Sequence, residues 1–108
     1  MQPHLILDRD HLARYTLGDA ALEQEVLSLF IGQIPETVTL LRESRDGQSW
    51  GRAAHTIKGS AKAIGAWKLA AAAERAERRA DQSDDWDRFV YEIEVAVAEV
   101  RARIAAPA

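Results

Sequence analysis

The chain has 108 residues, which suits one domain and is too short for two ordinary ones. Hydrophobic residues make up 47% of it, enough to fill one core, so we do not expect global disorder. A net charge of -3 argues against general nucleic-acid affinity, and the lack of cysteine excludes disulfides, thiolate metal sites and cysteine nucleophiles. No apolar run approaches the roughly 20 residues that a bilayer-spanning helix needs, so we expect a soluble, cytoplasmic protein.

The charged residues are unevenly distributed along the chain. Residues 51–68 contain four basic residues and no acidic one, whereas residues 81–99 contain seven acidic residues and a single arginine. The centre of the chain is therefore basic, and its C-terminal part is acidic. The acidic run near Asp84 lacks the spacing of a calcium-binding loop, and we interpret it as helix capping and solubility.

The N-terminal part predicts one short helix. Apolar residues recur at helical spacing throughout the chain, without the strict alternation that is typical of strands. Asp8 or Asp10 could cap a first helix over residues 9–16, which Gly18 would end.

A long second helix is predicted over residues 20–44, with Asp19 as its N-cap. Pro35 lies inside it, and an interior proline costs about 3 kcal/mol because it removes a hydrogen bond and clashes with the preceding turn. The apolar residues stay in phase across the proline, so we predict a kink rather than a break. These inward residues are Leu27, Phe30, Ile34, Val38 and Leu41.

A loop over residues 44–49 separates this helix from a third one over residues 50–64. Gly65 would end the third helix. Its apolar residues recur at steps of four and three and form one narrow inward stripe. The stripe consists of Trp50, Ala54, Ile57, Ala61 and Ile64.

Two further helices are predicted over residues 66–80 and 84–105, the last one capped by Ser83 or Asp84. The stripe of the fourth helix consists of Leu69, Ala72, Ala73, Ala76 and Ala80. The stripe of the last helix consists of Trp86, Phe89, Val90, Ile93, Val97, Val100 and Ile104. Four long amphipathic helices with short connections predict an all-α fold, an up-down-up-down four-helix bundle with a short additional N-terminal helix.

His55 lies on the polar side of the third helix, together with two lysines and two glycines. Lys58, Gly59 and Lys62 follow it by three, four and seven residues and therefore share its outward face. Gly51 and Gly59 lie one turn before and one turn after it, although glycine inside a helix costs roughly 1 kcal/mol relative to alanine. The two glycines leave bare backbone beside the imidazole, where another protein surface can approach closely.

This arrangement fits in-line phosphoryl transfer, which requires a nucleophile, a phosphoryl group and little steric obstruction. A neutral imidazole is a competent nucleophile near neutral pH because one ring nitrogen keeps its lone pair. Lys58 and Lys62 could neutralise phosphate oxygens, Lys58 more directly because it is one turn away. A single surface histidine is usually only solvated, and so are single lysines, so the prediction depends on their combination on one face.

The third helix contains Ala54-His55-Thr56-Ile57-Lys58-Gly59-Ser60-Ala61, followed by Ile64-Gly65-Ala66 and Leu69. This sequence resembles the signature of histidine-containing phosphotransfer (HPt) domains, in which Lys-Gly-Ser/Gly-Ala follows the histidine and a glycine ends the helix. Leu17-Gly18-Asp19 before the second helix is also similar to sequences of this family at that place, so the resemblance covers most of the chain. Lys62-Ala63 departs from the family pattern, and we expect this departure to affect partner choice and not the transfer residues.

The resemblance implies that His55 accepts the phosphoryl group at its outer ring nitrogen, that Lys58 stabilises the phosphate and that Gly59 provides clearance. In the family a Gln or Glu on the next helix often contacts the other ring nitrogen, and Glu77 occupies the matching place. Glu77 would then fix the tautomer and raise the nucleophilicity of the outer nitrogen. Alternatively, Glu77 is a surface residue paired with a nearby cation. As partner-binding residues we select Gly51, Arg52, Lys62 and Trp67.

The leading hypothesis is a phosphorelay carrier. It would accept a phosphoryl group from a receiver-domain aspartyl phosphate or a hybrid kinase and pass it to the receiver domain of a response regulator. The chain has no ATP-binding motif, so it should not phosphorylate itself, and it needs no cofactor or metal because Mg²⁺ would be bound by the receiver. We expect a monomer that binds neither nucleic acid nor membranes.

Two alternatives stay open. The phosphoacceptor and dimerisation part of a sensor histidine kinase typically has an acidic residue and a proline after the histidine, and neither follows His55 closely. A non-catalytic helical adaptor would bind its partners independently of His55. Met1 and the Ala105-Ala106-Pro107-Ala108 end suit a free-standing protein, although a piece of a hybrid kinase could have the same ends.

The remaining histidines and tryptophans are predicted to have other roles. His4 and His11 show no recurrent partner spacing and are predicted to be solvated. Trp50 and Trp86 are predicted to be core anchors, whereas Trp67, at the start of the fourth helix, could face the partner.

Overall fold

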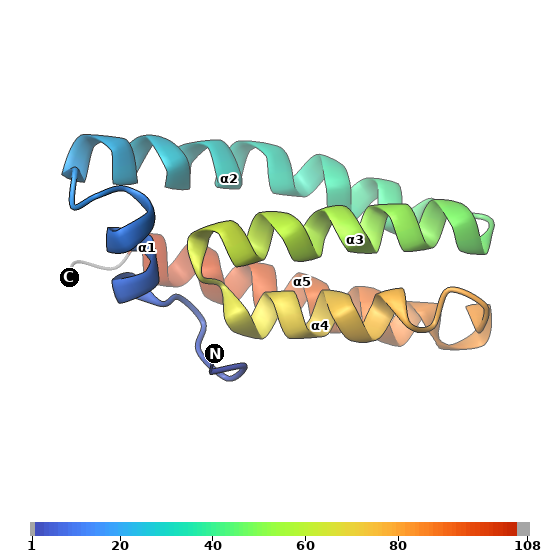
Figure 1. Ribbon diagram of the computed structural model, residues 1–108. Helices are drawn as coiled ribbons and strands as arrows, with labels where there is room; N and C mark the ends of the chain where they lie inside the picture. Colours follow the sequence, from blue (N-terminus) through green and yellow to red (C-terminus); the bar gives the residue numbers. More distant parts are fainter. Residues whose placement is uncertain (1, 106–108) are drawn as a thin grey trace.

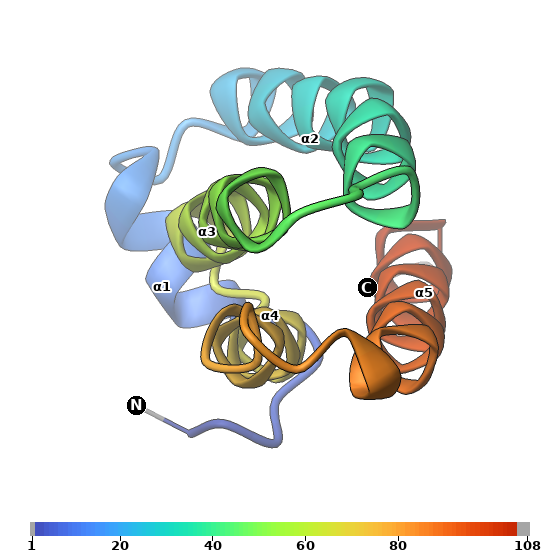
Figure 2. The same cartoon turned by 90° about the vertical axis from the view of Figure 1, so that its right-hand side faces the viewer.

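The computed structural model describes residues 2–105, and all regular structure within that range is helical, which confirms the all-α prediction. The elements are α1 (Arg9–Tyr15), α2 (Ala20–Arg42), α3 (Gly47–Ile64), α4 (Trp67–Glu77), the 3-10 helix η1 (Ser83–Asp85) and α5 (Trp86–Ala105). Helices α2 to α5 lie side by side around a common core, and α1 lies at one end of them (Figure 1, and end-on in Figure 2). Met1 and residues 106–108, which bear on the expectation of a free-standing protein, lie outside the described residues.

Helix α2 continues through Pro35, as predicted. The carboxylate of Asp19 caps its N-terminus by accepting a hydrogen bond from the backbone N–H three residues on, at 3.0 Å. The ribbon of α2 changes direction in its C-terminal half (Figure 2). The helix ends at Arg42, two residues earlier than predicted, and the backbone N–H of Ser44 just after it donates to the carbonyl oxygen of Leu41 in an i to i+3 turn.

Helix α3 begins at Gly47, three residues earlier than predicted. The reason is an N-cap inside the predicted loop, since the carboxylate of Asp46 accepts a hydrogen bond from the backbone N–H of Ser49 at 2.8 Å. A Cβ at Gly47 would lie 2.6 Å from the carbonyl oxygen of Ala80, so the start of α3 approaches the chain after α4 as closely as only glycine allows. Gly65 ends α3 in the left-handed conformation, with a φ of 78°, as predicted.

Helix α4 ends at Glu77, three residues earlier than predicted. The indole N–H of Trp50 donates to the carbonyl oxygen of Ala76 at 2.6 Å, and that of Trp86 donates to the carbonyl oxygen of Arg79 at 2.9 Å. These side chains bind carbonyls that a continuing helix would otherwise use. The chain can therefore leave the helix here without leaving these backbone carbonyl groups unpaired.

The connection to α5 also differs from the prediction. Ser83 and Asp84 do not cap the last helix, because both lie inside η1, which has no side-chain cap. Helix α5 then begins at Trp86, so the predicted cap was wrong although the position of the helix was nearly right.

The predicted inward stripes form one hydrophobic core, with Ala80, Trp86 and Ile104 only partly buried at its edge. The ring of Trp50 is 1% exposed and stacks on Trp86, with ring centres 4.4 Å apart and planes at 3°. Both tryptophans therefore pack as predicted. Over residues 2–105, none of the helices combines the length and apolarity that a membrane span requires.

Candidate functional site

His55 stands on the outer face of α3. Its side chain is 67% exposed, whereas Ala54 and Ile57 on the same helix are completely buried. Gly59, one turn later, is exposed, and a Cβ built there would meet nothing within 4 Å. The imidazole can therefore be approached by a large partner from the side of Gly59.

Three side chains from two helices form a cluster that we call the His55 cluster: His55 and Lys58 of α3, and Glu77 of α4. The ring nitrogen Nδ1 of His55 lies 3.0 Å from Oε2 of Glu77. Nζ of Lys58 donates to the other carboxylate oxygen, Oε1, at 2.7 Å. Sequence reasoning left open whether Glu77 orients the imidazole or pairs with a cation, and in the structure Glu77 makes both contacts.

The electrostatics of the cluster determine the tautomer of the ring. The hydrogen bond from Lys58 and, less strongly, the one with His55 hold the pKa of Glu77 below its usual value, so Glu77 is ionised near neutral pH. A carboxylate only accepts hydrogen bonds, so Nδ1 of His55 carries a proton, and in the neutral ring Nε2 then keeps its lone pair. Because the pKa of Glu77 is lowered on folding, its stabilising contribution is complete above the ordinary glutamate pKa and is lost as the pH falls through the lowered value.

The position of Glu77 is set by packing at the end of α4. Glu77 is the last residue of that helix, and the preceding residue, Ala76, accepts the indole hydrogen bond of the buried Trp50. Trp50 belongs to α3, the helix that carries His55. One hydrogen bond in the core therefore couples the turn that carries Glu77 to the helix that carries the imidazole.

The residues selected for partner binding are only partly brought together. Arg52 and Lys62 are exposed on α3. Gly51 is half-buried, and a Cβ at its position would lie 3.8 Å from the methyl group of Ala80, so it faces the chain after α4 as well as solvent.

Trp67 lies at the opposite end of α4 from Glu77, ten residues earlier and roughly 15 Å away along the helix axis. Its indole N–H donates to the carboxylate of Asp8 at 2.8 Å, and its ring packs edge-on against His11 with centres 4.9 Å apart. The prediction that His11 is simply solvated was wrong, because His11 packs beside Trp67 and Gly65. His4 is exposed, as predicted.

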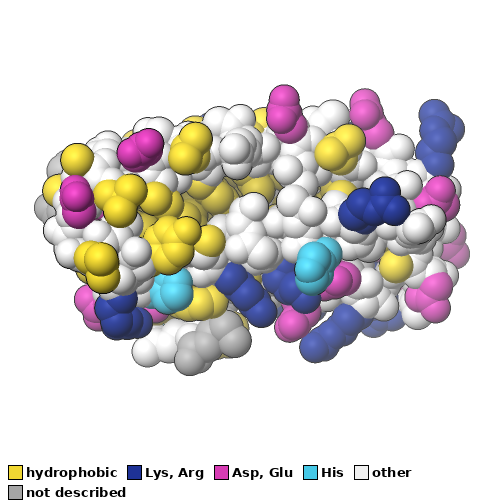
Figure 3. Space-filling model, turned by 45° about the horizontal axis from the view of Figure 1, so that its top comes forward, with side chains coloured by type: hydrophobic (Ala, Val, Ile, Leu, Met, Phe, Trp, Pro, Cys, Tyr) yellow, Lys and Arg dark blue, Asp and Glu magenta, His cyan; other side chains and the backbone are white. Residues whose placement is uncertain are grey.

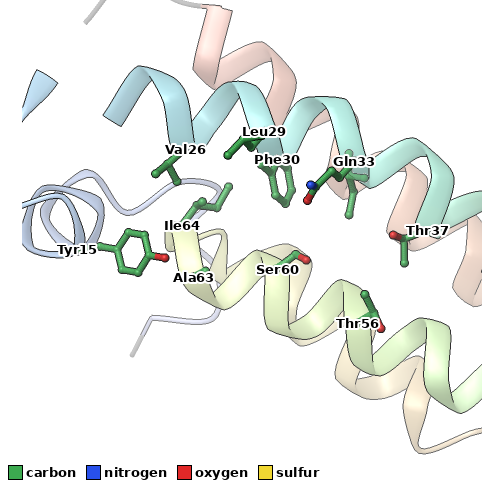
Figure 4. A pocket seen from close by; sticks show the side chains of 11 residues that line it. Tyr15, Val26, Leu29, Phe30, Gln33, Thr37, Thr56, Ser60, Ala63 and Ile64 are labelled. Carbon is green, nitrogen blue, oxygen red and sulfur yellow. The ribbon is translucent and has the colours of Figure 1, made fainter. Parts of the chain in front are cut away.

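A groove between α2 and α3 reaches the residue next to His55, and sequence reasoning missed it. Its volume is about 250 Å³, and Thr56 and Ser60 line its α3 wall (Figure 4). Leu29 lies on the opposite, α2 wall with 54% of its surface exposed, and Tyr15 of α1 lies at one end of the groove, near Ala63, with 56% exposed. Figure 3 shows hydrophobic side chains gathered toward the α1 end of this face. The signal in the sequence was Leu29, an apolar residue outside the inward stripe, but only the packing of two helices creates the groove.

No cluster for a metal ion is evident in the part of the chain that the structure describes, since no three His, Asp or Glu side chains come close enough together there. The His55 cluster itself contains one carboxylate, one imidazole and one ammonium group. The carboxylate and the ammonium group are paired with each other, and the imidazole lies beside this pair.

Comparison of the sequence with protein-family models gives a match to the family described as Hpt domain, over residues 25–103. The matched range contains the whole of α3 and α4, and so the complete His55 cluster. Comparisons with curated proteins and with solved structures give no significant match.

Proposed function

This chain belongs to the Hpt domain family, and from that premise we propose that it relays a phosphoryl group between signalling proteins through His55. The family carries out histidine phosphotransfer in two-component signalling. The donor would be a receiver-domain aspartyl phosphate or a hybrid kinase, and the acceptor the receiver domain of a response regulator. The observation that supports His55 as the carrier is its exposed ring, held at Nδ1 by Glu77 so that Nε2 is left for the phosphoryl group.

In the transfer step, the lone pair of His55 Nε2 attacks the phosphorus atom of the aspartyl phosphate. The N–P bond forms as the O–P bond breaks, and the aspartate leaves as a carboxylate. The ring keeps its Nδ1 proton, and the carboxylate of Glu77 offsets the positive charge that develops on the ring. Lys58, one turn away, would approach the phosphate oxygens. Transfer to the next receiver is the same step in reverse, with Mg²⁺ bound by the receiver.

We also propose that residues 1–108 form a single domain in which α2 to α5 make an up-down-up-down bundle. Figures 1 and 2 support this order, because the four helices lie alongside one another and short connections join consecutive helices. The two contacts of Glu77 also require α3 and α4 to be neighbours in the bundle, because they join α4 to His55 and Lys58 of α3.

The proposed function is tested by incubating the protein with a receiver domain that is phosphorylated on its aspartate. The chain should acquire a label that is lost in acid and retained in base, as expected of phosphohistidine, and fragment mapping should locate the label at residue 55. Incubation with ATP alone should give no label. An acid-stable label, or one that maps to His4 or His11, would contradict the proposal.

We propose that the receiver covers the groove between α2 and α3 together with Arg52 and Lys62. An aspartyl phosphate reaches His55 only if the receiver lies against α3, and a stable interface of about 800 Å² per partner extends well beyond one residue. The apolar wall of the groove would supply buried area, and the two cations would attract acidic groups of the receiver. Gly51 and Trp67, both half-buried, would form the margins of this surface.

Replacement of Gly59 by glutamine is expected to slow transfer by about tenfold or more, because side-chain obstruction misplaces the reacting groups. Side chains on a helix lean toward its N-terminus, so a side chain at position 59 would cover the turn that carries His55. Stability should rise by up to about 1 kcal/mol, since glycine is the poorer helix former and the position is open. Transfer kinetics with one receiver and urea unfolding measure the two effects.

Gly32 provides the matched control. It is an exposed glycine inside α2, and a Cβ at its position also meets nothing within 4 Å. Gly32→Gln should therefore raise stability by a similar amount and leave transfer unchanged. Equal transfer rates for Gly59→Gln and the unsubstituted protein would show that the space beside His55 is not needed.

A further inference from the structure

Lys58, the residue expected to meet the phosphate oxygens, is already engaged by Glu77. The distance from its Nζ to Oε1 of Glu77 is 2.7 Å, shorter than the 3.0 Å between Oε2 of Glu77 and His55 Nδ1. The Lys58 side chain is only 18% exposed, compared with 67% for His55, so it lies against the protein surface rather than in solvent. One carboxylate therefore holds both the nucleophile and the cation beside it.

We propose that Glu77 competes with the phosphoryl group for Lys58 and so weakens the phosphohistidine, which favours passing the group onward. This inference rests on the proposed function of His55 as the carrier. The phosphoryl group would bind Nε2, the ring nitrogen that does not face Glu77. The ammonium of Lys58 must therefore leave or share its carboxylate partner before it reaches the phosphate oxygens. The phosphorylated state is therefore less stable by the free energy of the Lys58–Glu77 ion pair that is given up.

Glu77 also acts in the opposite direction, because its charge stabilises the positive ring of the phosphohistidine. Replacing Glu77 alone would report only the sum of the two effects. Glutamine keeps an oxygen that accepts from Nδ1–H but lacks the charge that holds Lys58. Methionine at position 58 keeps most of the apolar length of the lysine without its charge. A double-mutant cycle of E77Q and K58M therefore isolates the competition from the direct effect on the ring.

The experiment equilibrates the unsubstituted protein, E77Q, K58M and the double variant with the same phosphorylated receiver. The quantity measured is the transfer equilibrium constant, from the phosphorylated fractions of both proteins. E77Q should shift the equilibrium toward phosphohistidine by about two- to fivefold more when Lys58 is present than in the K58M background, the range expected for a partly exposed ion pair. Urea unfolding checks that all four proteins are folded. The coupling ratio is the fold-shift that E77Q causes with Lys58 present, divided by the fold-shift that it causes in the K58M background. A coupling ratio of one, or a ratio below one, overturns the inference.

The ion pair of Lys68 with Glu99 serves as the control. It also joins two helices, α4 and α5, with an Nζ to Oε2 distance of 3.0 Å, but neither residue belongs to the His55 cluster. The cycle of K68M and E99Q should give a coupling ratio of one, and a ratio equal to that of Lys58 and Glu77 would attribute the effect to general loss of charge and overturn the inference. Absence of label on the unsubstituted protein would overturn the proposed function and the inference with it. Normal labelling with no coupling overturns the inference alone.

Discussion

The substitution His55→Gln should abolish phosphoryl transfer through the chain and leave the fold intact. The nitrogen of a carboxamide has no available lone pair, so no nucleophile remains at this position, whereas the side chain can still donate a hydrogen bond to Glu77. Because His55 is 67% exposed and makes no core contact, the free energy of unfolding should change by no more than about 0.5 kcal/mol. Label transfer from a phosphorylated receiver and urea unfolding measure the two results.

His4→Gln is the matched control for this substitution. His4 is exposed, like His55, and its replacement should leave both transfer and stability unchanged. Full labelling of the His55→Gln protein would mean that the carrier is another residue. Unfolding of that variant would mean instead that His55 has a structural role that its exposure does not indicate.

The second large effect is expected on stability, from Trp50→Ala. Trp50 is 1% exposed, stacks on Trp86 and donates to the carbonyl oxygen of Ala76. Truncating a buried tryptophan typically costs 3–5 kcal/mol, out of a total stability of about 5–15 kcal/mol for a domain. The free energy of unfolding in urea should fall by about that amount. The molecules that stay folded should also transfer more slowly, because the end of α4 that carries Glu77 loses its anchor on α3.

Trp50→Phe and Trp86→Ala separate the causes of this loss. Phenylalanine keeps most of the buried area and removes the indole donor, and the carbonyl of Ala76 still accepts from the backbone N–H of Arg79, so a loss of only about 1 kcal/mol is expected. Trp86 is only half-buried, so its truncation should cost less than that of Trp50. A loss of less than about 1 kcal/mol for Trp50→Ala would show that Trp50 does not anchor the end of α4 on α3.

The helices were largely predictable from the sequence because helical periodicity is a local property. The stripe from Leu27 to Leu41 stays in phase through Pro35, and all its members are buried. The boundaries were less predictable, since they depend on single side chains. Asp46 starts α3 within the predicted loop, and where α4 ends early, indole groups from other parts of the chain bind one carbonyl in its last turn and one just after it.

The same distinction applies to the candidate site. His55, Lys58 and Gly59 lie on one helix face, so their proximity follows from spacing alone. The two contacts of Glu77 depend on how α3 packs against α4, and sequence patterns could not choose between them. The location of Trp67 depends on the N-terminal segment, whose Asp8 binds the indole, and no local pattern indicates that contact.

Glu77 occupies the last residue of α4, at the negative end of the helix macrodipole, which is an unfavourable place for a carboxylate. The ammonium of Lys58 compensates for that location, so the two positions should evolve together. Among relatives, a glutamate at the position of Glu77 should be accompanied by a basic residue at that of Lys58, whereas a neutral glutamine there should tolerate more varied partners. In an alignment of the family, covariation of these two positions would show that the charge balance between Glu77 and Lys58 is a general feature.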